Sequence, residues 1–162
     1  MITYDYNGPW GRTVGHASPI SQQLATLEEY HKRGAPRAKL LMSVPFFART
    51  WRLADPHKQE IGDSASGGGT KGPYTQTEGQ LSYNELCVMI KNNPSAFSLV
   101  RDPKEHAVHA IYTHGSSVEW ISFEDTKTLA SKAKNITEDG YGGMVVYTLS
   151  NEDVHGVCGT KY

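Results

Sequence analysis

The sequence predicts an α/β fold, because strand-like and helical segments alternate along the chain. Residues 39–45 are almost continuously apolar, as a strand covered on both faces requires, and residues 21–30 repeat apolar side chains at helical spacing. Residues 1–4 are rich in β-branched and aromatic side chains and precede a turn at 7–9, which predicts another strand. These three segments form a βαβ unit, whose crossover helix makes its two strands parallel.

The middle of the chain has a different character. Residues 62–73 are rich in glycine, residues 83–90 resemble a short helix, and residues 108–112 and 118–123 resemble a hairpin of two strands. We therefore expect a small α+β insertion. The alternation then resumes with a helix over 126–136, which ends at a glycine, and a buried strand over 143–147.

Composition excludes several classes of partner. The 162 residues include 16 basic and 17 acidic side chains, for a net charge of −1, which favours neither a nucleic acid nor an anionic membrane as partner. No apolar stretch is long enough to cross a bilayer, and the opening residues do not resemble a signal peptide.

Two features could suggest cofactor or metal chemistry. The glycine-rich stretch lacks the Gly-Lys-Ser/Thr ending of a phosphate-binding loop. His106, His109 and His114 fall on mixed faces of a strand with no cysteine nearby, so we expect surface histidines rather than a metal site. We expect neither a metal nor another cofactor.

Cys87 and Cys158 are the two cysteines, and composition alone leaves open whether they are buried thiols or a disulfide closing a long loop. Asn135-Ile136-Thr137 is an acceptor sequence for N-glycosylation, which matters only in a secreted protein.

Aromatic and charged side chains gather at the carboxyl ends of the predicted parallel strands, where α/β folds bind ligands. Tyr4, Asp5, Phe47, Arg49 and Tyr147 lie there, and Trp10 lies in a following loop. Aromatic rings that stack on a sugar face, beside charged groups that bind hydroxyls, suit a neutral, hydroxyl-rich ligand. Ordinary packing of these aromatic rings is the alternative.

Several ordered motifs resemble glycoside hydrolase family 18, the chitinases. Residues 2–10 (ITYDYNGPW), 44–49 (VPFFAR) and 142–153 (GGMVVYTLSNED) resemble the motifs of its sixth, seventh and eighth barrel strands. Residues 79–87 and 120–125 resemble landmarks of the chitinase insertion domain. Within the family, residues 15–19, 30–37 and 147–159 are most similar to the chitinase-like group 18 allergens of mites.

The resemblance implies the C-terminal part, strands six to eight, of a TIM (β/α)8 barrel with an inserted α+β domain. Residues 1–51 and 119–162 would form the partial barrel, and residues 52–118 the insertion domain. Strands one to five would lie upstream, so Ile2, Leu41, Val44 and Val145 should face missing neighbours.

The resemblance also implies site residues. Tyr4 and Asp5 would hold and orient the substrate's acetamido group, Trp10 would stack on a sugar, and Arg49 would line the cleft. Phe47 replaces a tyrosine of the family, and Tyr147 replaces the tryptophan that floors the central subsite. The family's acidic motif, which ends in the general-acid glutamate, occurs nowhere in this sequence, so we expect no catalytic residue in this chain.

Three functional hypotheses follow. The first is a chitinase-like protein that binds chitin or chito-oligosaccharides and is weakly active or inactive. The alternative is a piece of an active chitinase whose catalytic strand lies outside this chain. The third is an allergen surface that binds antibodies (IgE) and no sugar. In each case the resemblance implies an extracellular protein with a signal peptide upstream, a Cys87–Cys158 disulfide and a usable glycosylation site at Asn135.

Overall fold

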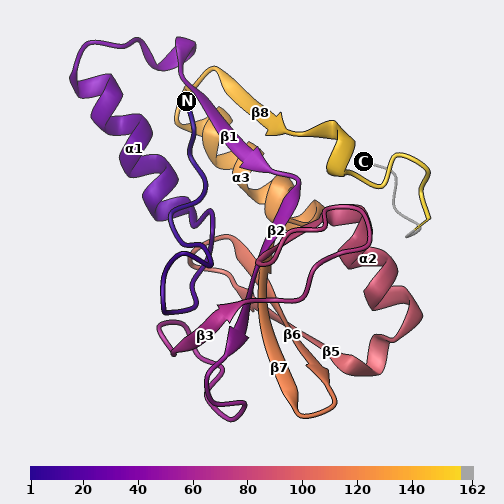
Figure 1. The fold of residues 1–162 in the computed structure, drawn as a ribbon. Coiled ribbons are helices and arrows are strands. Elements are labelled where there is room, and N and C mark those ends of the chain that lie inside the picture. Colours follow the sequence, from indigo (N-terminus) through magenta and orange to yellow (C-terminus); the bar gives the residue numbers. More distant parts are fainter. Residues whose placement is uncertain (158–162) are drawn as a thin grey trace.

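The computed structural model describes residues 1–157, and within them two sheets with no strand in common (Figure 1). The first sheet has two strands, β1 (Leu41–Pro45) and β8 (Gly143–Tyr147), which pair in parallel as predicted. Helices α1 (Ile20–Lys32) and α3 (Thr126–Glu138) flank it, and side chains of both helices share one apolar core with β1. This part of the chain is the predicted α/β layer.

The second sheet is antiparallel and has the strand order β3-β2-β7-β6-β5, with the short strand β4 also paired to β2. Helix α2 (Tyr83–Asn92) packs against this sheet through Leu86. Its strands are β2 (Phe47–Leu53), β3 (Ala65–Gly68), β4 (Gln80–Ser82), β5 (Phe97–Asp102), β6 (Ala107–His114) and β7 (Ser117–Phe123). Short 3-10 turns lie at Arg37–Lys39, Pro94–Ala96 and Leu149–Asn151.

The helix boundaries follow from local chemistry. Helix α2 begins with a capping box, in which Glu85 accepts from the backbone N–H of Ser82. Helix α3 is capped by Asp125, whose side chain accepts from two backbone N–H groups of the first turn. Helix α1 is followed by Gly34 with a φ of 101°, a conformation that favours glycine. The three predicted helices are confirmed within a few residues at each end.

The predicted strand over residues 1–4 is wrong, because these residues make no backbone ladder. Side chains replace the ladder: the Thr3 N–H donates to Ser43 Oγ at 2.8 Å, and the Ser43 N–H donates to Thr3 Oγ1 at 2.7 Å. Short hydroxyl side chains compete with backbone pairing in this way. The segment still runs beside β1, so the structure places Tyr4 and Asp5 next to the end of that strand.

The two predicted domain boundaries lie within strands of the second sheet. Strand β2 pairs with β7 from Arg49 to Arg52, so both strands belong entirely to the second sheet. The predicted boundary after residue 51 therefore falls inside β2, and the boundary before residue 119 falls inside β7. The chain passes between the sheets at Phe46 and again after Phe123.

One face of the two-stranded sheet is open to solvent. Ile2, Leu41 and Val145 are exposed, as predicted for side chains that lack neighbours. Val44 is fully buried, contrary to the prediction, because it points with Met42 toward the core shared with the helices. Side chains alternate between the two faces of a strand, so Leu41 and Val44 face opposite ways.

The turn between β5 and β6 connects the second sheet to the helices beside the first. Glu105 accepts from the N–H and hydroxyl of Ser21 at the start of α1, at 3.2 and 2.6 Å. His106 Nδ1 lies 2.5 Å from the hydroxyl of Ser131 on α3. We call residues 102–106, with these contacts, the docking turn.

Histidines of β6 differ from the prediction. His109 is buried rather than on the surface: its ring stacks on Trp120 at a centroid distance of 4.2 Å and lies 5.6 Å from His16. Both faces of β6 are covered along most of its length, so a polar side chain there is buried whichever way it points.

Within residues 1–157, no cluster of three or more potential ligands could hold a metal ion. None of the helices in this part of the chain combines the length and apolar character needed to cross a bilayer.

Candidate functional site

A cleft of about 500 Å³ opens where the N-terminal segment and the two sheets meet. Five of the six predicted binding residues line it, together with three residues that the sequence analysis did not select. The lining residues are Ile2, Tyr4, Asp5, Phe47, Arg49, Gln80, Tyr147 and Asn151. Trp10 is the sixth predicted residue; it does not line the cleft, but its ring lies beside Arg49.

Asp5 and Arg49 form a bidentate ion pair across the cleft. Arg49 Nε donates to Asp5 Oδ1 at 2.8 Å, and Nη2 donates to Oδ2 at 2.7 Å. Asp5 holds a left-handed backbone conformation with a φ of 62°, which turns its carboxylate toward the start of β2. Two parallel hydrogen bonds fix the direction of both side chains as well as their separation.

The rest of the Arg49 guanidinium is also occupied. Nη1 donates to Gln80 Oε1 at 2.7 Å. The ring of Phe47 lies 4.5 Å from the guanidinium carbon and that of Trp10 lies 5.1 Å from it, both within cation–π range. Arg49 therefore orients Asp5 and Gln80, and its three nitrogens are already engaged before any ligand binds.

Aromatic side chains form the remaining surface of the cleft. Tyr4 stacks on Tyr147 at a centroid distance of 6.1 Å and meets Phe47 edge-on at 5.7 Å. Tyr147 is 56% exposed and Trp10 is 63% exposed, so each has ring surface available to a ligand. Burial and the neighbouring Asp5 carboxylate raise the pKa of Tyr4, which keeps its hydroxyl protonated and able to donate.

Gln80 and Asn151 are the polar lining residues that sequence reasoning missed. Gln80 reaches the cleft because β4 pairs with β2 in a register that sets Gln80 opposite Arg49. Asn151 lies in the short turn after β8. No local pattern in the sequence points to Gln80, because its place in the cleft depends on the pairing of β4 with β2.

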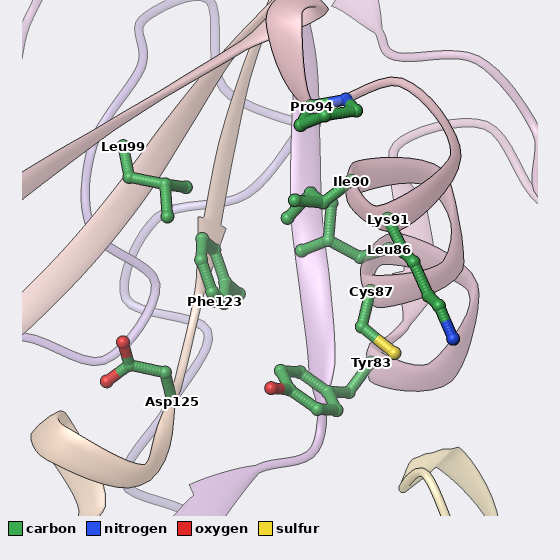
Figure 2. A pocket seen from close by; sticks show the side chains of 9 residues that line it. All are labelled: Tyr83, Leu86, Cys87, Ile90, Lys91, Pro94, Leu99, Phe123 and Asp125. Carbon is green, nitrogen blue, oxygen red and sulfur yellow. The ribbon is translucent and has the colours of Figure 1, made fainter. Parts of the chain in front are cut away.

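A second cavity, of about 400 Å³, lies between α2, the middle of β5 and the end of β7 (Figure 2). Its apolar lining residues include Leu86, Ile90, Leu99 and Phe123. Its polar lining residues lie at the margin. Asp125 at that margin is already bound to Arg101 and to the first turn of α3. This cavity shares no lining residue with the cleft.

The sites predicted for covalent modification lie away from the cleft. Asn135 lies in α3, half-buried, and its side chain donates to the Ser131 carbonyl at 2.9 Å. Cys87 lies on α2 beside the second cavity (Figure 2). Cys158 lies outside the described residues, so its pairing with Cys87 stays a prediction. Lys91, one turn further along α2, donates to the carbonyl of Val157 at 2.7 Å, which brings the residue preceding Cys158 to this helix.

We expect Cys87 and Cys158 to be joined, so that the oxidised, folded chain shows no reactive thiol when denatured without reductant. In the chain-entropy model, a bridge closing a loop of this length raises the free energy of unfolding by roughly 4 kcal/mol, because it restricts the unfolded chain. Thiol titration in denaturant, with a Cys87→Ser variant as the one-thiol standard, measures this directly. Two reactive thiols in the wild-type chain would contradict the pairing.

Comparison with known proteins defines the class of this chain. Residues 1–152 match the family model described as glycosyl hydrolases family 18, and the chain belongs to that family. It is 63% identical over 161 residues to the chitinase-like mite allergen Der p 18.0101 of Dermatophagoides pteronyssinus, an alignment that covers 99% of this chain and 35% of that relative. The chain thus spans about a third of the length of this curated relative.

Solved structures agree with the family assignment. The Group IV chitinase of Ostrinia furnacalis matches with a TM-score of 0.89 and 27% identity, over 98% of this chain and 45% of that one, and it has also been solved in complex with allosamidin. Human YKL-39 matches with a TM-score of 0.87 and 24% identity, over 98% of this chain and 45% of that one. It is described as a pseudo-chitinase with retained chitooligosaccharide binding properties. The fold is therefore that of family 18, an α/β fold related to the TIM barrel.

Proposed function

We propose that this chain supplies the acetamido-binding side of a chito-oligosaccharide cleft in a chitinase-like protein whose hydrolytic activity is weak or absent. In this proposal β1 and β8 correspond to strands seven and eight of the barrel, residues 1–4 follow the path of strand six, and the second sheet with α2 is the chitinase insertion domain. The observation that carries the proposal is the ion pair of Asp5 with Arg49, set among Tyr4, Tyr147 and Trp10.

The chemistry of the cleft suits a sugar that carries an N-acetyl group. The Asp5 carboxylate keeps lone pairs beyond the two that Arg49 uses, so it can accept from an amide N–H. The exposed ring of Tyr147 can stack on the apolar face of a pyranose, although it offers less area than the tryptophan of active family members. In family 18 the substrate's own acetamido oxygen attacks the anomeric carbon, which still requires a protonated acid at the leaving group.

Binding without turnover is the expected result for the purified chain. Isothermal titration with chitotetraose should give saturable binding, weakened about tenfold by Tyr147→Ala because the stacking face is lost, and tightened by Tyr147→Trp. Incubation with the same oligosaccharide should release no product above a blank, because the sequence lacks the acidic motif that ends in the family's general-acid glutamate.

Tyr30→Ala provides the matched control, since Tyr30 is half exposed on α1 and does not line the cleft. Equal affinities for all four chains, or no binding at all, would contradict the proposal. Turnover above the blank that Asp5→Ala abolishes would contradict the absence of catalysis.

A second candidate is a contribution to an active chitinase, favoured by the 27% identity to the Ostrinia furnacalis enzyme over 98% of this chain. Turnover by a longer protein that includes this chain would decide for it.

The likeness to mite allergens favours a further proposal, that the protein is secreted and its surface binds IgE. Secretion would make Asn135 available for glycosylation. Mass spectrometry of the secreted protein tests that site.

A further inference from the structure

We infer that Gln80 is a ligand-binding residue of the cleft, and that with Asp5 it selects N-acetylated over deacetylated sugars. Gln80 would donate to the acetamido carbonyl oxygen while Asp5 accepts from the acetamido N–H. This inference rests on the proposed function and adds to it a residue, Gln80, to which the family resemblance assigned no role.

Arg49 fixes the orientation of the Gln80 amide. A guanidinium has only donors, so the Gln80 atom that lies 2.7 Å from Nη1 must be the carbonyl oxygen Oε1. The amide nitrogen Nε2 then points elsewhere and carries two N–H donors. Within residues 1–157 Nε2 makes no hydrogen bond, and Gln80 lines the cleft only partly buried. The cleft therefore contains a donor of fixed direction.

The backbone of Gln80 is held as firmly as its side chain. Strand β4 pairs with β2 through three residues, and Ser82 at its end is anchored by the buried carboxylate of Glu85, which accepts from the Ser82 N–H and hydroxyl at 2.8 Å each. Thr75 donates to the Gln80 carbonyl at 3.2 Å. A donor held in place before binding loses little conformational freedom when a ligand arrives.

The donor, the Gln80 amide, and the acceptor, the Asp5 carboxylate, are held by two different edges of the Arg49 guanidinium. The edge formed by Nε and Nη2 holds Asp5, and Nη1 holds Gln80. An acetamido group presents its N–H and its C=O in opposite directions, so it can bridge an acceptor and a donor that are set apart. A free amine can still donate to Asp5, but it has no carbonyl to accept from Gln80, so the deacetylated sugar leaves the Gln80 donor unused. The arrangement thus distinguishes the two sugars at one group.

Gln80→Glu isolates the donor, because a carboxylate still accepts from Arg49 but has no N–H. We expect Gln80→Glu to weaken binding of chitotetraose about tenfold and to leave binding of the fully deacetylated tetramer unchanged or tighter. Gln80→Met, which removes the donor without adding a charge, should also weaken chitotetraose. Gln76→Glu is the matched control for added charge, since Gln76 is exposed in the loop before β4 and its side chain bonds only to Pro73 among the described residues.

The outcomes separate this inference from the proposed function. If the wild-type chain does not bind chitotetraose, the proposed function fails. If the wild type binds and Gln80→Glu and Gln80→Met keep their affinity, or if both tetramers weaken equally, the selectivity assigned to Gln80 is overturned while the proposed function stands. A thermal melt of each variant shows whether it is folded. If Gln80→Glu does not fold, the affinity of Gln80→Met alone decides whether Gln80 has the assigned role.

Discussion

Replacing Lys132 with methionine is expected to lower the free energy of unfolding by about 3–5 kcal/mol, because it leaves a buried carboxylate without its cation. Lys132 is fully buried in α3, and its Nζ donates to Glu124 Oε1 and to the Ser18 carbonyl. Glu124 is buried as well, and Ser18 is its other partner. Chemical denaturation of the variant and the wild type measures the difference.

Two further variants show whether the pair itself is responsible. Lys134→Met removes an exposed lysine of the same helix, whose ion pair with Glu138 has a separation of 3.8 Å, and should change stability by no more than about 0.5 kcal/mol. Lys132→Met combined with Glu124→Leu should recover most of the loss, since neither buried charge remains. A double variant as unstable as Lys132→Met would show that shape, not charge, is responsible.

Acidification from about pH 6.5 to pH 4 is expected to destabilise the fold by about 3 kcal/mol through His109 alone. Burial, with the charge of His16 as a smaller cause, lowers the pKa of His109 to about 4. Between those pH values the unfolded chain binds a proton that the folded chain does not, so stability falls as the pH falls. Burial lowers the pKa of His16 too, which acts in the same direction.

His109→Phe tests this, because phenylalanine can keep the stack on Trp120 and does not titrate. The unfolding free energy of this variant should depend less steeply on pH over the same interval. Asp102, Glu124 and Lys132 also influence His16 and are present in both chains, so their contributions cancel in the comparison. Identical pH profiles would show that His109 does not titrate as described.

The helices, the parallel pair β1–β8 and the hairpin β6–β7 could be predicted because each has a clear local pattern. Strand β2 could not, because the chain passes from one sheet to the other at Phe46, and five of the strand's seven residues are buried. With both faces covered, the alternation that identifies a strand and its exposed side is lost. The burial of His109 escaped prediction for the same reason.

The cleft could be predicted in outline. The carboxyl ends of parallel strands meet at one edge, and this brought Asp5, Phe47 and Tyr147 together. Gln80 could not be placed, because its position depends on a three-residue strand whose register is set by β2, 31 positions away. Pairing of short strands at that separation has no local signature in the sequence.

The docking turn has a consequence for how the cleft responds to a ligand. Glu105 and His106 attach the second sheet to both α1 and α3, so Arg49 and Gln80 are held in position relative to Tyr147 by contacts remote from the sugar. We therefore expect the two walls of the cleft to move as one body. A sugar meets a surface that is already shaped, and association should follow single-exponential kinetics whose rate rises linearly with sugar concentration, without a closing step.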